Sequence, residues 1–244
     1  MKFFVCIALL VSSVVGIRTQ KATNKLDLVF EKLKDSIGGL SEANSEEEVR
    51  DIGRNNAQIM SELAEEWEKA NVYLNSSTKD EILTRVQMLE TVAIDKNLVK
   101  EAATEARAIY EALSSPKDLA ALAENLVLNG FQSVFEQLVS ANDVSTISDL
   151  KTRYSLLCHQ HASLQSMGSP PEIKDDLKGN IGTSVTCLLN KADSLEDSPL
   201  KTALQSAAND ASEIYGALKN PSAIAALAEK LSRVGEYERG VRVG

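Results

Sequence analysis

The chain has 244 residues and a formal net charge of −9, from 26 lysine and arginine against 35 aspartate and glutamate residues. Nucleic acids and anionic membranes select for clustered basic residues, so this acidic balance argues against both as the main partner. Aromatic residues make up only 5%, whereas the strong helix formers Ala, Leu, Glu and Lys recur throughout. The composition therefore predicts an all-α fold, in a chain long enough to bury its own core.

Residues 1–16 have the pattern of a secretory signal peptide. Lys2 gives a positive start, residues 3–11 are apolar, and small residues lead up to Gly16. The apolar run is shorter than the roughly 18 residues that a membrane-spanning helix needs, and no later stretch is more apolar. We therefore expect a secreted, extracellular protein without integral membrane association.

The rest of the chain resembles itself at an offset of 105 residues. Of the 25 residues in 102–126, 14 are identical to their partners in 207–231, and the segment 29–33 returns as 134–138. Self-similarity at a fixed spacing is the signature of a repeated structural unit. The sequence thus predicts a tandem duplication of a helical bundle of roughly 105 residues, with about five helices per unit.

The predicted units are residues 17–130 and 131–235, followed by a C-terminal tail over 236–244. The apolar stripes of the helices fit two separate bundles or one shared bundle, and both alternatives stay open. The sequence also leaves the oligomeric state open.

In unit 1 the first helix is predicted to end at Gly38 and Gly39, because glycine commonly follows a helix C-terminus. Asn44 or Ser45 is the expected cap of the second helix, which starts with three glutamates. We expect Asp95 to cap the fourth helix. Pro116 is expected to open the fifth helix, and Asn129 and Gly130 to close unit 1. In unit 2, Pro199 and Pro221 are expected to open the last two helices.

Two cysteines remain once Cys6 leaves with the signal peptide. In a secreted chain Cys158 and Cys187 most simply form one disulfide, which would stabilise the fold by roughly 3 to 4 kcal/mol. The residues 105 positions earlier are not cysteines, so this bridge would belong to unit 2 alone. Asn75 begins the Asn-Ser-Ser sequon, in an expected loop where a glycan could be attached.

No catalytic or metal-binding pattern is present in the sequence. His159 and His161 are two positions apart, so they point to different sides of a helix and cannot share an ion. We expect both at the surface or rim, beside Cys158. Neither a nucleophile motif nor a phosphate-binding glycine loop is found. The sequence therefore predicts no enzyme activity, no metal and no cofactor.

A duplicated helical scaffold fits a binding protein better than a catalyst. Five side chains on the expected core-facing stripes are candidates for lining a ligand cavity: Tyr110, Tyr215, Trp67, Ile109 and Ile214. The favoured function is a secreted, non-catalytic carrier that holds or sequesters an apolar small molecule between helices. The alternative is a secreted protein-interaction module, or effector, that presents an acidic helical face to a protein partner.

Overall fold

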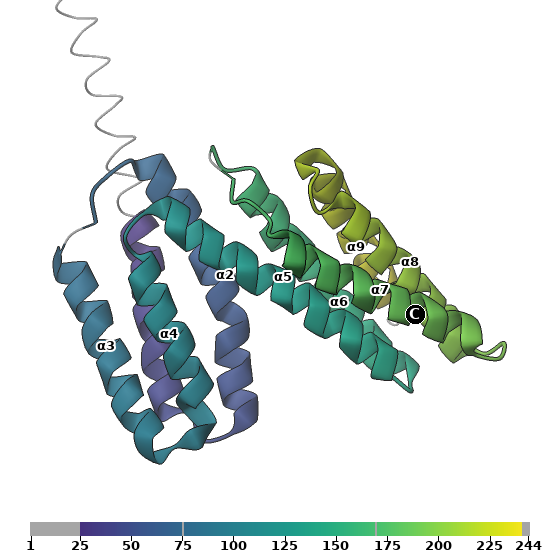
Figure 1. Ribbon diagram of the computed structural model, residues 1–244, viewed down its shortest axis with the longest axis horizontal. Helices are drawn as coiled ribbons and strands as arrows, with labels where there is room; N and C mark the ends of the chain where they lie inside the picture. Colours follow the sequence, from purple (N-terminus) through teal and green to yellow (C-terminus); the bar gives the residue numbers. More distant parts are fainter. Residues whose placement is uncertain (1–24, 75, 169, 241–244) are drawn as a thin grey trace, which may run out of the picture. The chain divides into compact units, whose positions relative to one another are not determined.

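The computed structural model describes residues 25–74, 76–168 and 170–240, and this part of the chain is helical without any strand (Figure 1). The predicted signal peptide and Asn75 lie outside the described residues. Contacts divide the chain into two compact units, unit 1 over Met1–Leu122 and unit 2 over Ala123–Gly244. No helix of the described residues is long and apolar enough to cross a membrane.

Unit 1 contains a first helix over residues 25–42, α2 (Glu46–Ala70), α3 (Ser76–Asp95), the short 3₁₀ helix η1 (Asn97–Val99), α4 (Lys100–Ala112) and the start of α5 (Pro116–Ser140). Ser45 caps α2 as predicted, since its hydroxyl accepts a hydrogen bond of 3.2 Å from the amide of Glu48. The prediction for Asp95 was wrong. This residue ends α3, and η1 precedes α4.

The prediction that Gly38 and Gly39 end the first helix was also wrong, because the helix continues to residue 42. A Cβ at Gly38 would lie 2.6 Å from the Arg85 guanidinium of α3. Gly39 lies inside the same helix, where its carbonyl accepts a hydrogen bond from the amide of Ala43.

The core of unit 1 consists of aliphatic side chains with one aromatic pair. Trp67 meets Phe30 edge-on at 6.2 Å between ring centroids, and its indole donates a 2.9 Å hydrogen bond to the carbonyl of Val72. This bond holds the chain just after Asn71, whose φ of 49° ends α2 in the left-handed conformation. The aliphatic core residues that are fully buried include Leu33, Ile37, Leu63, Ile82, Val86, Leu89 and Ile109.

Unit 2 contains the rest of α5, α6 (Val144–Gln165), α7 (Asp175–Ser194), α8 (Pro199–Ala217) and α9 (Pro221–Gly240). In this unit α6 packs on α8 and α9, and α7 packs on α8. The predicted proline starts are confirmed, because Pro116, Pro199 and Pro221 each begin a helix. Proline lacks only an N–H that would have no partner at this position.

Two predicted interruptions are absent. The helix α5 runs without a break through Asn129 and Gly130, where we expected unit 1 to close, and the division between the units falls inside this helix. Gly130 gives Leu157 of α6 room, because a Cβ there would lie 2.9 Å from the Leu157 side chain. At the other end α9 continues to Gly240, into the segment predicted as a tail.

The helices of the two units correspond in order, but at more than one spacing. Pro116 and Pro221 are 105 positions apart, whereas the N-caps Ser45 and Asp143 are 98 apart. Val29 and Val134 are also 105 positions apart, so unit 2 is seven residues shorter between this segment and the cap of its second helix, which is close to two helical turns. The buried residues of α3 find their counterparts on α7 at a spacing of 99: Ile82, Val86 and Leu89 correspond to Ile181, Val185 and Leu188.

Candidate functional site: a groove between α3 and α4

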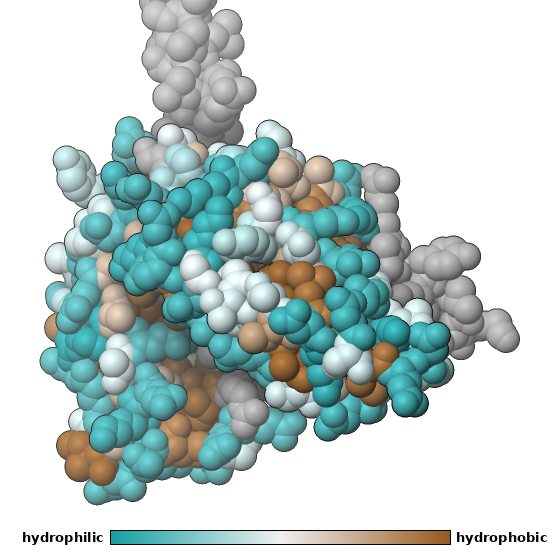
Figure 2. Space-filling model, turned by 45° about the vertical axis from the view of Figure 1, so that its right-hand side comes forward, coloured by the Kyte–Doolittle hydropathy of each residue, from teal (hydrophilic) through white to brown (hydrophobic). Residues whose placement is uncertain are grey.

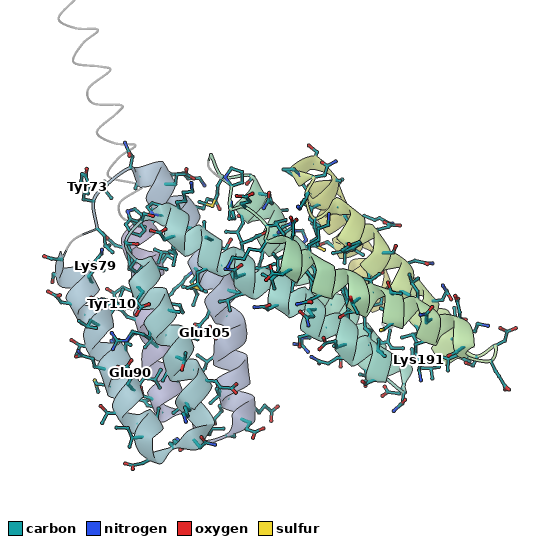
Figure 3. The ribbon with its side chains drawn as sticks, viewed as in Figure 1. Tyr73, Lys79, Glu90, Glu105, Tyr110 and Lys191 are labelled. Atoms are coloured by element: carbon teal, nitrogen blue, oxygen red, sulfur yellow. The ribbon has the colours of Figure 1, made fainter. Side chains whose placement is uncertain are left out.

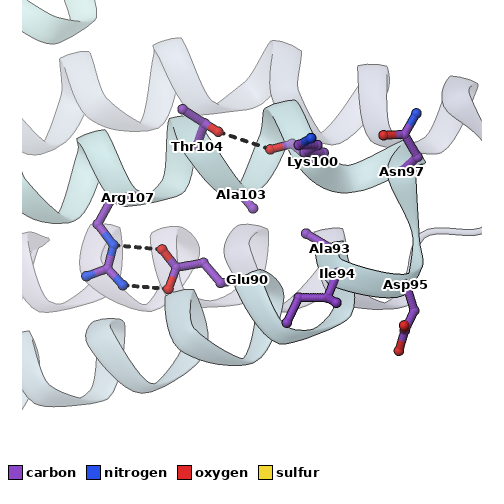
Figure 4. A pocket seen from close by; sticks show the side chains of 9 residues that line it. All are labelled: Glu90, Ala93, Ile94, Asp95, Asn97, Lys100, Ala103, Thr104 and Arg107. Carbon is purple, nitrogen blue, oxygen red and sulfur yellow. Dashed lines mark hydrogen bonds and ion pairs between the residues drawn. The ribbon is translucent and has the colours of Figure 1, made fainter.

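A groove of about 500 Å³ lies between α3 and α4 of unit 1 (Figure 4). These helices form a hairpin connected by η1 and pack directly on each other. Nine residues line the groove: Glu90, Ala93, Ile94, Asp95, Asn97, Lys100, Ala103, Thr104 and Arg107. On α4 the positions 100, 103, 104 and 107 recur at intervals of three and four, so they share one face of that helix.

An ion pair closes one end of the groove. Arg107 donates from Nε and Nη2 to the two carboxylate oxygens of Glu90, at 2.8 and 2.5 Å. Figure 4 shows this pair bridging α4 and α3. The guanidinium holds the pKa of Glu90 below its usual range. Both charged groups are thus satisfied by each other in a two-point geometry that is typical of strong arginine–carboxylate pairs.

Small side chains make the middle of the groove. Ala93 and Ala103 face each other across the hairpin, with the longer Ile94 beside them (Figure 4). Ile94 is 82% exposed, which is unusual for a large aliphatic side chain. An apolar molecule between the two helices would cover this side chain together with the alanines.

The other end of the groove is formed by η1 and the first residue of α4. Asn97 and Lys100 line both this groove and a second hollow of about 540 Å³, whose other lining residues are Glu46, Val49, Leu98 and Glu101. The carbonyl of Lys100 accepts a 3.1 Å hydrogen bond from the Thr104 hydroxyl. Within the described part of the chain, the Lys100 ammonium has no ion pair.

The surrounding surface is mostly polar. On the face shown in Figure 2, hydrophilic residues predominate and apolar side chains are exposed in separate areas. The large apolar residues of unit 1 that are exposed are Leu28, Val72, Tyr73, Met88 and Ile94. Ile94 is the member of this set that lines the groove.

The five residues predicted to line a cavity do not line either hollow. Ile109 and Ile214 are fully buried among core side chains, and Trp67 is almost fully buried against Phe30. Tyr110 and Tyr215 are half-buried at equivalent positions of α4 and α8 (Figure 3 labels Tyr110).

Each tyrosine ring lies under a cation. The Arg107 guanidinium is 5.8 Å from the Tyr110 ring centroid, and the Lys178 ammonium is 5.5 Å from that of Tyr215. The Tyr215 ring also occupies the space above Gly182, where a Cβ would be 2.9 Å from the ring. The Tyr215 ring therefore covers part of α7.

The predicted disulfide is absent, because Cys158 and Cys187 are both free. Cys158 is buried in the core-facing side of α6, whereas Cys187 is exposed on α7, so the two side chains face different surroundings. Burial, assisted by the negative charge of Asp210, raises the pKa of the Cys158 thiol to about 12. By helix order, Cys158 corresponds to the buried Met60 of unit 1, and not to Gly53 as the uniform spacing implied.

The surface prediction holds for His159 but was wrong for His161, which is fully buried. His161 Nε2 lies 2.9 Å from the carbonyl oxygen of Leu218, and Nδ1 lies 2.9 Å from a carboxylate oxygen of Glu124, which is 1% exposed. A carbonyl only accepts hydrogen bonds, so Nε2 carries a proton. The contact between Nδ1 and the carboxylate must then share one further proton.

The packing pattern of α6 explains why His161 is buried. It continues a stripe with spacings of three and four whose other buried members are Ile147, Leu150, Tyr154, Cys158 and Leu164. This spacing was a signal that could have identified the buried histidine.

Among the described residues, no group of three or more His, Cys, Asp or Glu side chains is placed to hold a metal ion. No protein-family model matches the sequence, and no curated protein or solved structure is significantly similar to it.

Proposed function

We propose that this chain is a secreted, non-catalytic binding protein that carries or sequesters an apolar small molecule in the groove between α3 and α4. The observation that carries the proposal is the exposed Ile94 beside the Ala93 and Ala103 floor. A groove of about 500 Å³ is within the roughly 300 to 1,000 Å³ of small-molecule sites. Secretion is supported by the leader pattern of residues 1–16.

We further propose that the two units arose by duplication and that unit 1 alone acquired the groove. The common helix order, the proline starts and the matched buried residues support the duplication. The ion pair that closes the groove has no counterpart in unit 2, where Leu189 and Ser212 stand at the positions of Glu90 and Arg107. A shared scaffold with one specialised half explains both the likeness and the difference.

Fluorescence titration with N-phenyl-1-naphthylamine, a neutral apolar probe, tests the proposed function. Ile94→Ser removes apolar wall from the groove and should weaken probe binding about tenfold, which corresponds to roughly 1.4 kcal/mol of lost burial. Met88→Ser is the matched control, because Met88 is 60% exposed on the same helix but does not line the groove. Equal binding by both variants and the unchanged protein would contradict the proposal.

A second candidate function is the protein-interaction module with an acidic face. The second hollow favours it, because two carboxylates, Glu46 and Glu101, outnumber the one ammonium there, and Val49 and Leu98 add apolar surface. A basic residue with an apolar neighbour would suit this combination. Native mass spectrometry of protein from a eukaryotic secretory host distinguishes the two candidates. A co-purified small molecule supports the carrier, a bound protein supports the module, and the intact mass reports glycosylation at Asn75.

A further inference from the structure

We infer that the ligand of the groove is a small anionic amphiphile whose negative group binds Lys100 while its apolar part lies on Ala93, Ile94 and Ala103. This inference rests on the proposed function and specifies the class of ligand. It follows from the charges that line the groove and from the distance between its ends.

The two cations of the groove, Arg107 and Lys100, differ in whether a carboxylate already binds them. Arg107 is already engaged at two points by Glu90, at 2.8 and 2.5 Å, so an anion at that end would have to displace a carboxylate. Lys100 lines the opposite end and has no ion pair in the described part of the chain. Among the described residues, Lys100 is therefore the cation that lines this groove without an ion pair.

Asp95 is the acidic residue that lines the groove at the same end as Lys100. Figure 4 shows its carboxylate directed away from Ala93 and Ala103. Glu46 and Glu101 line the second hollow with Lys100 but do not line this groove, so an anion above the alanines is expected to meet the ammonium.

The length of the groove limits the size of the ligand. Lys100 and Arg107 are seven residues apart on α4, so the distance between the two ends is about 10 Å at a rise of 1.5 Å per residue. The apolar part of the ligand is therefore short, like a pair of fused rings or a medium-length chain. Because the protein carries a net charge of −9, anionic bilayers would repel it, and we expect the amphiphile to bind as a free molecule.

Two probes with the same aromatic skeleton test this inference. 8-Anilino-1-naphthalenesulfonate differs from N-phenyl-1-naphthylamine by a single sulfonate, so the ratio of their dissociation constants reports the anion site. We expect the sulfonate probe to bind about fivefold more tightly, as for one partly exposed ion pair. Lys100→Gln should abolish this advantage, so that the ratio of the two dissociation constants falls from about five to about one.

Lys117→Gln is the matched control, because it removes an equal charge from an exposed lysine of unit 1 that does not line the groove. Thermal unfolding followed by circular dichroism verifies that each variant is folded before titration. Lys117→Gln should retain the full preference for the sulfonate probe. Loss of the preference in both variants would contradict a specific role for Lys100.

The outcomes separate the two proposals. If the neutral probe binds and depends on Ile94 but the sulfonate adds no affinity, the inference fails while the proposed function stands. If neither probe depends on Ile94, both fail. Sedimentation with vesicles of anionic phosphatidylglycerol should show no binding, and binding that depends on Lys100 would overturn the inference of a free amphiphile.

Discussion

The phenol of Tyr154 on α6 donates a 2.6 Å hydrogen bond to the carboxylate of Asp210 on α8. A hydrogen bond also joins the second and fourth helices of unit 1: the side-chain amide of Asn56 on α2 donates to the carboxylate of Glu105 on α4 at 3.2 Å. In both units a neutral donor thus holds a carboxylate between two helices. The two carboxylates nevertheless differ in what else neutralises them, which leads to opposite predictions.

Glu105→Gln should stabilise the protein at pH 7. Burial raises the pKa of Glu105, and the hydrogen bond from Asn56 only partly opposes this. A raised pKa in the folded state means that stability falls as pH rises from the ordinary carboxyl pKa through the raised value. The neutral glutamine removes this cost, by on the order of 1 kcal/mol, while it can still accept the bond from Asn56. Urea unfolding at pH 4 and pH 7 should show a gain mainly at pH 7.

Asp210→Asn is the comparison for this substitution. Lys151 lies 3.6 Å from Asp210, and Tyr154 donates to it, so its charge is compensated. We expect this variant to lose about 1 kcal/mol in the free energy of unfolding at pH 7. A loss of stability in Glu105→Gln similar to that in Asp210→Asn would contradict the distinction.

His161→Leu should lower the free energy of unfolding by roughly 3 to 5 kcal/mol, because it leaves the buried Glu124 without its main partner. Leucine is the residue found at the corresponding position of unit 1, Leu63, so its size alone does not forbid it. The double variant His161→Leu with Glu124→Leu should recover most of the loss. Additive losses in a double-mutant cycle measured by urea unfolding would refute a coupled pair.

The two thiols should react at very different rates. In the native protein Cys187 is exposed and should react with Ellman's reagent at once, whereas Cys158 is buried, has a pKa of about 12, and should react only on unfolding. Because no disulfide joins them, a reducing agent should leave the Tm unchanged. A Tm lowered by several degrees under reducing conditions would show that a bridge forms.

Arg107→Ser, which copies the residue of unit 2, should raise the pKa of Glu90 towards its ordinary value. In the unchanged protein that pKa is lowered by Arg107, so the stabilisation from the pair is present above the ordinary carboxyl pKa and is lost as pH falls through the lowered one. NMR titration of the Glu90 side chain measures this directly. An unchanged pKa would mean that the pair is not maintained in solution.

Much of the fold could be predicted because helix-forming composition, capping residues and helix-starting prolines are local signals. Ser45 and Pro199 act through their immediate neighbours, so the sequence alone identifies their roles. A glycine, in contrast, can end a helix or lie inside one, and its immediate neighbours in the sequence do not distinguish the two. Gly38 and Gly130 both lie inside helices, against the side chains of Arg85 and Leu157, which are remote in sequence.

The candidate groove could not be predicted for the same reason. Glu90 and Arg107 are on separate helices, and nothing in their spacing indicates that they meet. Ala103 belongs to the segment 102–126 that is repeated in the sequence, and its small side chain leaves space for the groove. The disulfide prediction failed because the number of cysteines does not tell which way each cysteine side chain points.

The seven-residue difference between the units has a consequence for how this scaffold tolerates change. Seven residues are about 10 Å of helix but only some 20° short of two full turns. A helix shortened by this amount keeps nearly the same side facing its neighbours. The N-cap residue of the next helix therefore has almost the same orientation about the helix axis. Loss or gain of one heptad is therefore a mild alteration here, whereas removal of one or two residues would turn the apolar stripe into solvent.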